Sequence, residues 1–275
     1  MLGQYDSTKV QDYLYLDLGG SLSSCRDELV SPLRYTGIHS SIRAGYSNRK
    51  IKRQWLVEVL YTQGDLSSNA LSVQREQIPS LQRYQFNFVY DFSLPSLQLN
   101  KWNFTVGLDA QGWLVYRENR EFGNASFTFD QALTLGPTFT ANKVWQKQKK
   151  ERHLWFLSWN QKPHKMRWSN RFSTGLLGQA SRPSYQTIIN YTGENITVFD
   201  LITNEENLFF GLADQVFSLR TTSALSWEFF NGNELQIIYR WSYYSLQNKS
   251  QEGNNQSEGS MNTVGLAFYY SLYRR

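Results

Sequence analysis

The chain has 275 residues and a formal net charge of +5, from 28 Lys and Arg against 23 Asp and Glu. No stretch approaches about 18 consecutive apolar residues, which excludes a helical membrane protein. The charge excess is small and no nucleic-acid-binding motif accompanies it, so we expect no nucleic-acid partner. Aromatic residues make up 16% of the chain although its mean hydropathy is −0.52. That combination is typical of a membrane barrel whose strands alternate lipid-facing and lumen-facing residues.

Apolar and polar residues alternate with period two along most of the chain, which indicates β-strands. In chain order, the alternating segments are residues 13–18, 38–46, 55–62, 84–92, 102–109, 127–130, 155–160, 166–172, 217–228, 235–244 and 264–272. The segment 84–92 is the clearest, because Tyr84, Phe86 and Phe88 share one face with two further aromatic residues. A helix would need apolar residues three and four positions apart, and these segments lack them.

Short and long connections roughly alternate between these segments. Tight turns are expected at Arg49–Lys52, Leu94–Lys101, Lys162–Lys165 and Asn231–Asn233, and long loops at Ser23–Thr36, Gly64–Ser80, Gln146–Lys150, Gly178–Ala213 and Asn248–Ser260. Outer-membrane barrels have short periplasmic turns and longer outer loops. This pattern predicts a single all-β domain over residues 1–275, with about 12 antiparallel transmembrane strands (10 to 14 remain open) and residues 1–12 as a periplasmic segment. The stretch from Arg117 to Lys143 is ambiguous because no clear turn divides it.

A soluble β-sandwich or lipocalin-like barrel would also show alternation. Two features disfavour it. Bulky aromatic residues occur on nearly every apolar face, more than one small core could hold, and charged residues occupy the middle of the opposite faces. We therefore expect a barrel in the bacterial outer membrane. No signal peptide is visible near Met1, so we expect the export signal to have been removed. Cys25 is the only cysteine, and we expect an unpaired thiol in a loop.

If the apolar faces meet lipid, the charged faces meet the lumen. The expected lumen network consists of Asp17, Arg43, Glu58, Asp91, Asp109, Asp130, Arg167, Arg171, Arg220, Glu228 and Arg240. Acids and bases are nearly balanced, and every base is arginine, which suits bidentate pairing with carboxylates. A barrel of this size has a narrow interior, so we expect an occluded lumen. A thin pore with separate acidic and basic walls remains the alternative.

The segment Thr263–Tyr273 resembles the terminal strand by which outer-membrane proteins are recognised by the barrel-assembly machinery, although Arg274 and Arg275 follow it. Glu28–Gly37 and Gly178–Tyr185 look like loop segments of outer-membrane proteins from Bacteroidota. The resemblance implies a cell-envelope protein and attaches no activity to it. Some barrels of this kind serve as accessory subunits of assemblies for nutrient import, secretion or barrel insertion.

His39 and Ser41 are the candidates for catalysis. Their His-x-Ser spacing resembles that of outer-membrane phospholipase, but alternation places both residues on the lumen face beside Arg43. We therefore expect network members and no catalytic set. No His, Asp or Glu cluster has metal-ligand spacing and no nucleotide motif occurs, so neither a metal nor a cofactor is expected.

A basic cluster consists of Lys143, Trp145, Lys147, Lys149, Lys150 and Arg152. It could bind lipopolysaccharide phosphates at the outer rim, or it could be an ordinary solvated loop. A second basic group, Arg49, Lys50, Lys52 and Arg53, is expected to meet anionic phospholipid headgroups on the periplasmic side.

The leading functional hypothesis is a non-enzymatic accessory or structural subunit of an outer-membrane complex. Its expected partners are outer-membrane lipid, lipopolysaccharide, and other outer-membrane or periplasmic proteins. The alternatives are a narrow channel or transporter for small solutes and, third, a lipid hydrolase.

Overall fold

The computed structural model describes residues 11–28, 31–50, 52–68, 79–94, 102–118, 127–147, 150–154, 157–161, 164–182, 207–248 and 256–272. Its strands are β1 (Gln11–Asp27), β2 (Ser31–Arg49), β3 (Arg53–Asp65), β4 (Ser80–Ser93), β5 (Trp102–Glu118), β6 (Phe127–Lys147), β7 (Lys150–Leu154), β8 (Leu157–Gln161), β9 (His164–Gly175), β10 (Leu177–Ser181), β11 (Leu208–Leu212), β12 (Val216–Glu228), β13 (Glu234–Gln247) and β14 (Gln256–Ser271). Among the described residues, no helix is long and apolar enough to cross a membrane.

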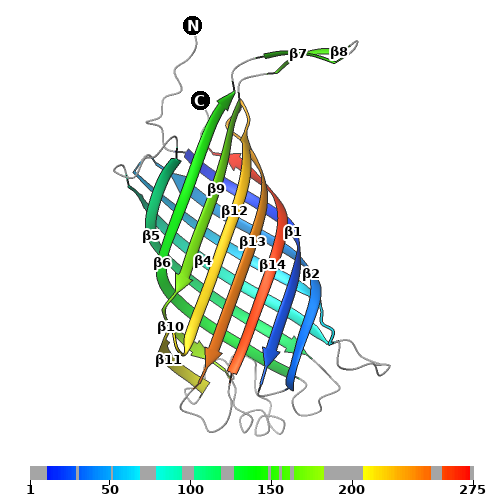
Figure 1. Ribbon diagram of the computed structural model, residues 1–275, viewed down its shortest axis with the longest axis vertical. Coiled ribbons are helices and arrows are strands. Elements are labelled where there is room, and N and C mark those ends of the chain that lie inside the picture. The colour runs from blue at the N-terminus through cyan, green and yellow to red at the C-terminus, as the bar shows by residue number, and fades with distance from the viewer. Residues whose placement is uncertain are drawn as a thin grey trace.

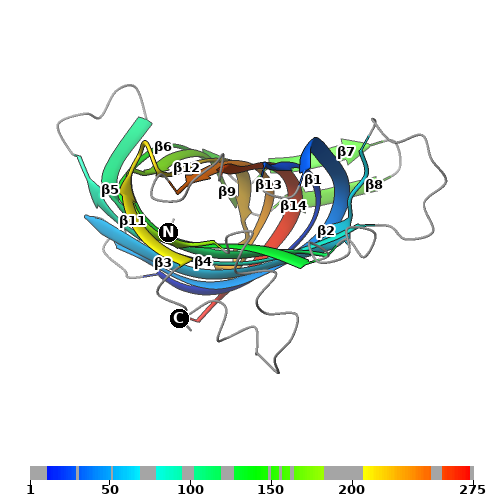
Figure 2. The ribbon, with the colours of Figure 1, turned by 90° about the horizontal axis from the view of Figure 1, so that it is seen from below.

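Ten strands close an antiparallel barrel in the order β6-β5-β4-β3-β2-β1-β14-β13-β12-β9, and β9 pairs back to β6 (Figure 1). The long strands run obliquely around a single interior, as the view along the barrel shows (Figure 2). β10 continues along β6 beyond the end of β9, and β11 pairs with β10. The sheet therefore contains 12 strands, the number expected from the sequence, but only ten of them close the barrel.

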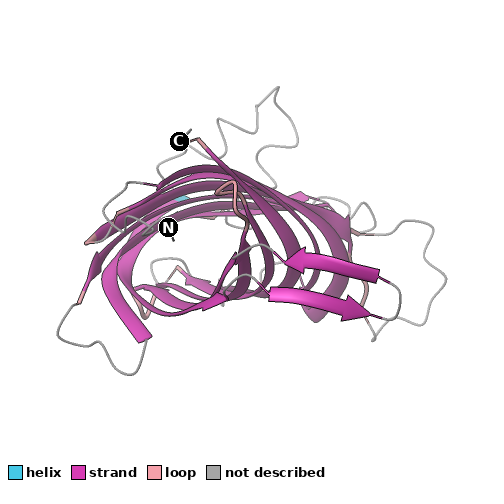
Figure 3. Cartoon of the chain, turned by 90° about the horizontal axis from the view of Figure 1, so that it is seen from above, coloured by secondary structure: helices cyan, strands magenta, loops and turns pink. Residues whose placement is uncertain are grey.

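The two counts differ by β10 and β11. A separate error concerns the barrel strand that the sequence predicts at residues 155–160. Residues 157–160 lie in the β7–β8 hairpin, whose two strands pair with no other described strand. The hairpin projects beyond the barrel wall (Figure 3). The prediction of a barrel strand there was wrong because alternation is a local property, which a free hairpin and a barrel strand share. The ambiguous stretch after Arg117 is also resolved, since β5 ends at Glu118 and one long strand, β6, runs from Phe127 to Lys147.

β1 begins and β14 finishes at the same end of the barrel, where the Leu272 amide donates to the Asp12 carbonyl at 2.9 Å. We call this the terminal end and the opposite end the loop end. The turns β2–β3 and β12–β13 and the β7–β8 hairpin lie at the terminal end (Figure 1). The connections β1–β2, β3–β4, β5–β6, β10–β11 and β13–β14 lie at the loop end. The expected segregation of turns and loops is therefore largely present.

Three expected loops differ from the structure. The expected loop Gly178–Ala213 contains most of β10 at its start and β11 near its end. The Ser23–Thr36 loop is absent, because β1 extends to Asp27 and β2 begins at Ser31. Cys25 is consequently a buried residue of β1. The segment Gln146–Lys150 joins β6 to β7 at the terminal end, not at the loop end.

The two segments that look like Bacteroidota loops lie largely in strands. Most of Glu28–Gly37 belongs to β2, and the described part of Gly178–Tyr185 is mainly β10.

The outer surface of the barrel is apolar. Large exposed side chains project from nine of the ten closing strands, and they include Leu14, Ile42, Val59, Phe86, Leu108, Leu135, Phe172, Ile237 and Leu266. The outward side chains of β12 are half-buried. Aromatic pairs flank this band. At the terminal end Tyr46 packs on Trp55 (4.8 Å between ring centroids), and Trp102 packs on Trp168 (5.5 Å). Toward the loop end Tyr61 packs on Tyr84 (5.0 Å). An apolar band between two aromatic girdles is the surface of a barrel embedded in lipid.

Candidate functional site in the barrel lumen

The inward faces of the ten closing strands carry mostly polar side chains, and these fill the lumen. Alternation along each strand produces this arrangement: in β1, for example, Tyr15 and Asp17 are buried inside while Leu16 and Leu18 are exposed outside. The structure brings the predicted network together. Its fully buried members are Asp17, Arg43, Glu58, Asp91, Asp109, Asp130, Arg220 and Arg240. Arg167, Arg171 and Glu228 lie on the same inward faces nearer the terminal end and are partly exposed.

Glu58 on β3 is the centre of a middle layer. It pairs with Arg43 on β2 and, at 3.3 Å, with Arg220 on β12. The Tyr15 hydroxyl donates to it at 2.5 Å and the Asn87 amide at 2.7 Å. Because β12 stands across the barrel from β3, these bonds bridge the lumen.

Two further acids complete the middle layer. Arg220 also reaches Asp109 on β5, at 2.6 Å. Asp17 on β1 pairs with Arg240 on β13 and lies 3.9 Å from the Arg43 Nε. The middle layer therefore joins strands from all sides of the barrel.

A second layer lies near the terminal end. Glu234 pairs with Arg49 at 2.6 Å and also with Arg167. The guanidinium of Arg49 lies 4.7 Å from the Tyr13 ring centroid, which holds it inside the barrel. The expectation that Arg49 would face lipid headgroups with Lys50, Lys52 and Arg53 is therefore wrong for this residue.

Asp91 forms the other half of the terminal layer. Arg171 contacts it at 3.0 Å, and the Gln54 side-chain amide donates to it at 2.7 Å.

A third layer closes the loop end. Arg117 contacts Asp130 at 2.5 Å and Asp27 at 3.0 Å, and Arg182, which follows β10, pairs with the same two acids. The Ser257 hydroxyl donates to Asp130 at 2.6 Å.

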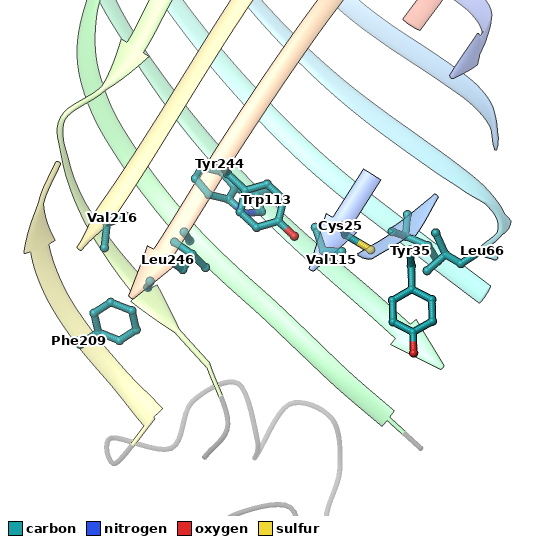
Figure 4. Packing of buried hydrophobic residues seen from close by; sticks show 12 residues of the cluster. Cys25, Tyr35, Leu66, Trp113, Val115, Phe209, Val216, Tyr244 and Leu246 are labelled. Atoms are coloured by element: carbon teal, nitrogen blue, oxygen red, sulfur yellow. The ribbon is translucent and has the colours of Figure 1, made fainter. Parts of the chain in front are cut away.

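An apolar cluster packs across the same end of the interior, from β11 and β12 to β1 and β2 (Figure 4). Its members include Cys25, Tyr35, Leu66, Trp113, Val115, Phe209, Val216, Tyr244 and Leu246. Phe209 comes from β11, so the short β10–β11 extension contributes to closing the barrel.

Sequence reasoning missed five members of these layers: Asp27, Arg49, Arg117, Arg182 and Glu234. Asp27 lies an even number of residues after Asp17, and Glu234 lies an even number before Arg240, so each shares the inward face of its strand. Continuing the alternation along these strands would have found both residues. Alternation does not identify Arg182 as an inward-facing residue. It lies after a five-residue strand in a segment that reads as loop.

Glycines on the inward face make room for large side chains. A Cβ atom on Gly45 would lie 2.6 Å from the Tyr15 ring, and one on Gly259 would also collide with the Tyr244 ring. The close approach of these tyrosines to the opposing backbone allows a narrow barrel to hold several buried aromatic and charged groups at once.

A cavity of about 90 Å³ remains between the middle layer and the terminal end. Six arginines line it, whereas only two acids, Glu58 and Asp91, do so; the arginines are Arg43, Arg49, Arg167, Arg171, Arg220 and Arg240. Side-chain exposure is 25% for Arg167 but 5% for Arg43. The arginines that line it are thus more exposed toward the terminal end than at the middle layer, and we call this cavity the vestibule.

His39 and Ser41 do face the lumen, as predicted, and both are buried. His39 Nε2 lies 2.5 Å from the Ser23 hydroxyl, so the serine beside the histidine is not the predicted one. His39 Nδ1 has no hydrogen-bond partner within the described residues, and a catalytic histidine needs an orienting acceptor there. Among the described residues, no group of three or more His, Cys, Asp and Glu side chains could hold a metal ion.

The predicted lipopolysaccharide cluster lies at the terminal end. The Lys143 ammonium sits on the outer face 5.4 Å from the Trp102 ring centroid and 5.5 Å from that of Trp145. The side chains of Lys147, Lys150 and Arg152, and all of Lys149, fall outside the described part. The topology prediction assigned the terminal end to the periplasm, so an outer-rim role for this cluster is incompatible with it.

Comparisons with known proteins identify solved outer-membrane barrels with little sequence similarity. The outer-membrane protease OmpT from Escherichia coli is 6% identical, with a TM-score of 0.49, 97% of this chain covered and 98% of that chain. Neisserial surface protein A is 11% identical, with a TM-score of 0.36 and coverages of 94% and 97%. OprG from Pseudomonas aeruginosa is 8% identical, with a TM-score of 0.25 and coverages of 94% and 96%. At these values no site or activity carries over. No protein-family model and no curated protein matches the chain.

Proposed function

We propose that this chain is an integral outer-membrane barrel with a closed lumen, acting as a non-enzymatic structural or accessory subunit of a cell-envelope assembly. The observation that carries the proposal is the set of three ion-pair layers bridging the lumen. A transport path or an active site needs open space, whereas the middle and loop-end layers place paired side chains across the interior. The apolar band and aromatic girdles support the membrane location.

The β7–β8 hairpin supports a role in assembly. It projects from the terminal end, and its strands pair with no other described strand. An isolated two-stranded hairpin is marginally stable in water, and its free edges can pair with a strand of another protein. Lys143 lies on β6 near the start of this hairpin, on the outer face beside Trp102, where its charge fits a periplasmic partner or anionic headgroups.

Native extraction tests this proposal. The tagged chain is purified in mild detergent from the membranes of its own host and sized by native electrophoresis. We expect an assembly larger than the lone barrel. Replacing residues 148–163 by a short Asn-Gly turn that joins β6 to β9 should leave a folded barrel and abolish the larger assembly. Replacing residues 249–255 in the same way at the loop end is the matched control and should preserve it. A wild-type chain that extracts only as a lone barrel contradicts the proposal.

A narrow channel for small solutes is the second candidate, and the vestibule is the observation that favours it. The pairing of Glu58 with Arg220 across the lumen distinguishes the two functions, because conduction needs a continuous path. A lipid hydrolase is disfavoured because His39 and Ser41 are buried inside the barrel, away from lipid. Retained lipid hydrolysis in a Ser41→Ala variant would remove these two residues from any such activity.

A further inference from the structure

We infer that the vestibule at the terminal end is a binding site for a small oxyanion, a phosphate or a carboxylate. The inference is independent of whether the barrel belongs to a larger assembly. It rests on the balance of donors and acceptors around the cavity, on its charge, and on its accessibility.

Several carboxylates near the vestibule accept hydrogen bonds from more than one side chain, whereas the guanidiniums have N–H donors that are not used. Glu234 accepts from Arg49, Arg167 and, at 2.5 Å, the Gln236 side-chain amide. Glu58 is likewise shared by Arg43 and Arg220. Arg220 also pairs with Asp109, and Arg43 lies 3.9 Å from Asp17. Each guanidinium has five N–H donors, so these arginines still offer more donors than the carboxylates that they share can accept.

Unused donors are found at the floor of the vestibule. The Nε atoms of Arg43 and Arg220 are buried and have no hydrogen-bond acceptor among the described residues. Both side chains line the cavity. A buried N–H group without an acceptor is costly, and a bound oxyanion would supply acceptors to several arginines at once.

The charge and shape of the cavity fit the same ligand. Six arginines line the vestibule, and five carboxylates pair with them: Asp17, Glu58, Asp91, Asp109 and Glu234. One positive charge is left in excess, and low-dielectric walls concentrate its field. A volume of about 90 Å³ holds several water molecules, and therefore one anion of phosphate size. Arginine forks match the geometry of phosphate and carboxylate oxygens.

The opening of the vestibule is formed by the most exposed of these arginines. Side-chain exposure is 25% for Arg167, 19% for Arg171 and 16% for Arg49. An anion can therefore enter from the terminal end, reach these partly exposed arginines first, and then bind the buried ones.

Calorimetric titration of inorganic phosphate into the purified chain in neutral detergent tests the inference. We expect saturable binding at one site, weakening as sodium chloride is added because exposed charges are screened. The double variant Arg167→Gln with Arg171→Gln should bind at least about tenfold more weakly. The carboxylates that pair with Arg167 and Arg171 each retain another partner in this variant. Glu234 still pairs with Arg49, and Asp91 still accepts a hydrogen bond from Gln54.

The matched control is Lys143→Gln with Arg53→Gln, which removes two positive charges at the same end but outside the cavity. It should bind phosphate within about twofold of wild type, because screening limits the effect of outside charges. Heat-modifiable migration on gels checks that each variant is folded. If the double variant does not fold, the single variant Arg167→Lys replaces it in the test. Lysine keeps the positive charge but lacks the paired N–H donors of the guanidinium, so phosphate binding should weaken severalfold.

A parallel titration with succinate shows whether the site prefers a phosphate or a carboxylate. Tighter phosphate binding assigns the site to phosphates, and tighter succinate binding assigns it to carboxylates; either outcome supports an oxyanion site. The inference is overturned if neither anion saturates the wild type. It is equally overturned if the control pair loses as much affinity as the vestibule pair.

Discussion

Arg117 holds together the loop-end layer, because its guanidinium contacts acids on two other strands, Asp27 on β1 and Asp130 on β6. Tyr244 from β13 also accepts from it at 3.3 Å. All of these groups are buried. In such surroundings the loss of one partner leaves an uncompensated charge, which costs far more than the loss of a solvent-exposed pair.

Replacement of Arg117 by Ala should therefore lower the free energy of unfolding by about 3 kcal/mol. Arg182 would remain as the only described arginine that pairs with Asp27 and Asp130. The measurement is urea unfolding in lipid vesicles, followed by tryptophan fluorescence.

The control is Arg34→Ala. Arg34 pairs with Glu258 at 2.5 Å on the outer surface, with its side chain 58% exposed. Its removal should cost about 1 kcal/mol or less. Equal losses in the two variants would mean that the loop-end layer is solvated and not buried.

At the scale of the strands, alternation gives each element one face for lipid and one for the lumen. In β14 Val264, Leu266 and Phe268 are exposed, whereas Gly265 and Ala267 face inward against β1 and β13. A shift of the register by one residue would exchange the two faces of the whole strand. The apolar band and the filled lumen therefore stabilise the same register.

Leu266→Arg tests the lipid-facing assignment of β14. Leu266 is 53% exposed and pairs with Leu18 and Ile237 in the middle of the apolar band. An arginine there should destabilise the barrel in phospholipid vesicles by about 2 to 4 kcal/mol.

The same substitution at Gln247, an exposed residue at the loop end of β13, should cost about 1 kcal/mol or less, since the penalty falls toward the interface. Unfolding in vesicles measures both variants. If Leu266→Arg is as stable as Gln247→Arg, the outer face does not meet lipid.

At the scale of the whole molecule, closure by ten strands determines what the interior can hold. Barrels of about eight strands are filled by their own side chains, while those of about 16 or more leave a water channel. The ten closing strands place this barrel near the filled limit. Among the described residues, the three layers and the apolar cluster pack inside the barrel, and the vestibule lies between the middle layer and the terminal end.

Planar-bilayer recording should accordingly show no stable conductance steps for the purified barrel, under conditions in which an added porin conducts. The physical reason is that ion pairs of the middle and loop-end layers bridge the lumen among the described residues. Reproducible steps from the wild-type chain, lost on heat unfolding, would establish the channel function in place of the closed barrel.

The sequence by itself determined the class of fold and the orientation of most side chains. Alternation is encoded in consecutive residues, so the segments around Tyr84 and Leu266 predict both strand and outward face without knowledge of any partner strand. The same reasoning placed Asp17, Glu58 and Arg220 inside the barrel, and it expected their charges to be mutually compensating.

Only the tertiary structure decided the number of closing strands and the pairing of the charges. Both depend on contacts between residues far apart in the sequence. Arg182 reaches Asp27 over a separation of 155 residues, and Arg49 reaches Glu234 over 185. Residues 155–160 alternate as a barrel strand does, but residues 157–160 pair only with β7 among the described strands, in a hairpin outside the barrel. The arginine-rich vestibule exists because closure brings the ends of β2, β9, β12 and β13 around one space, which local pattern cannot specify.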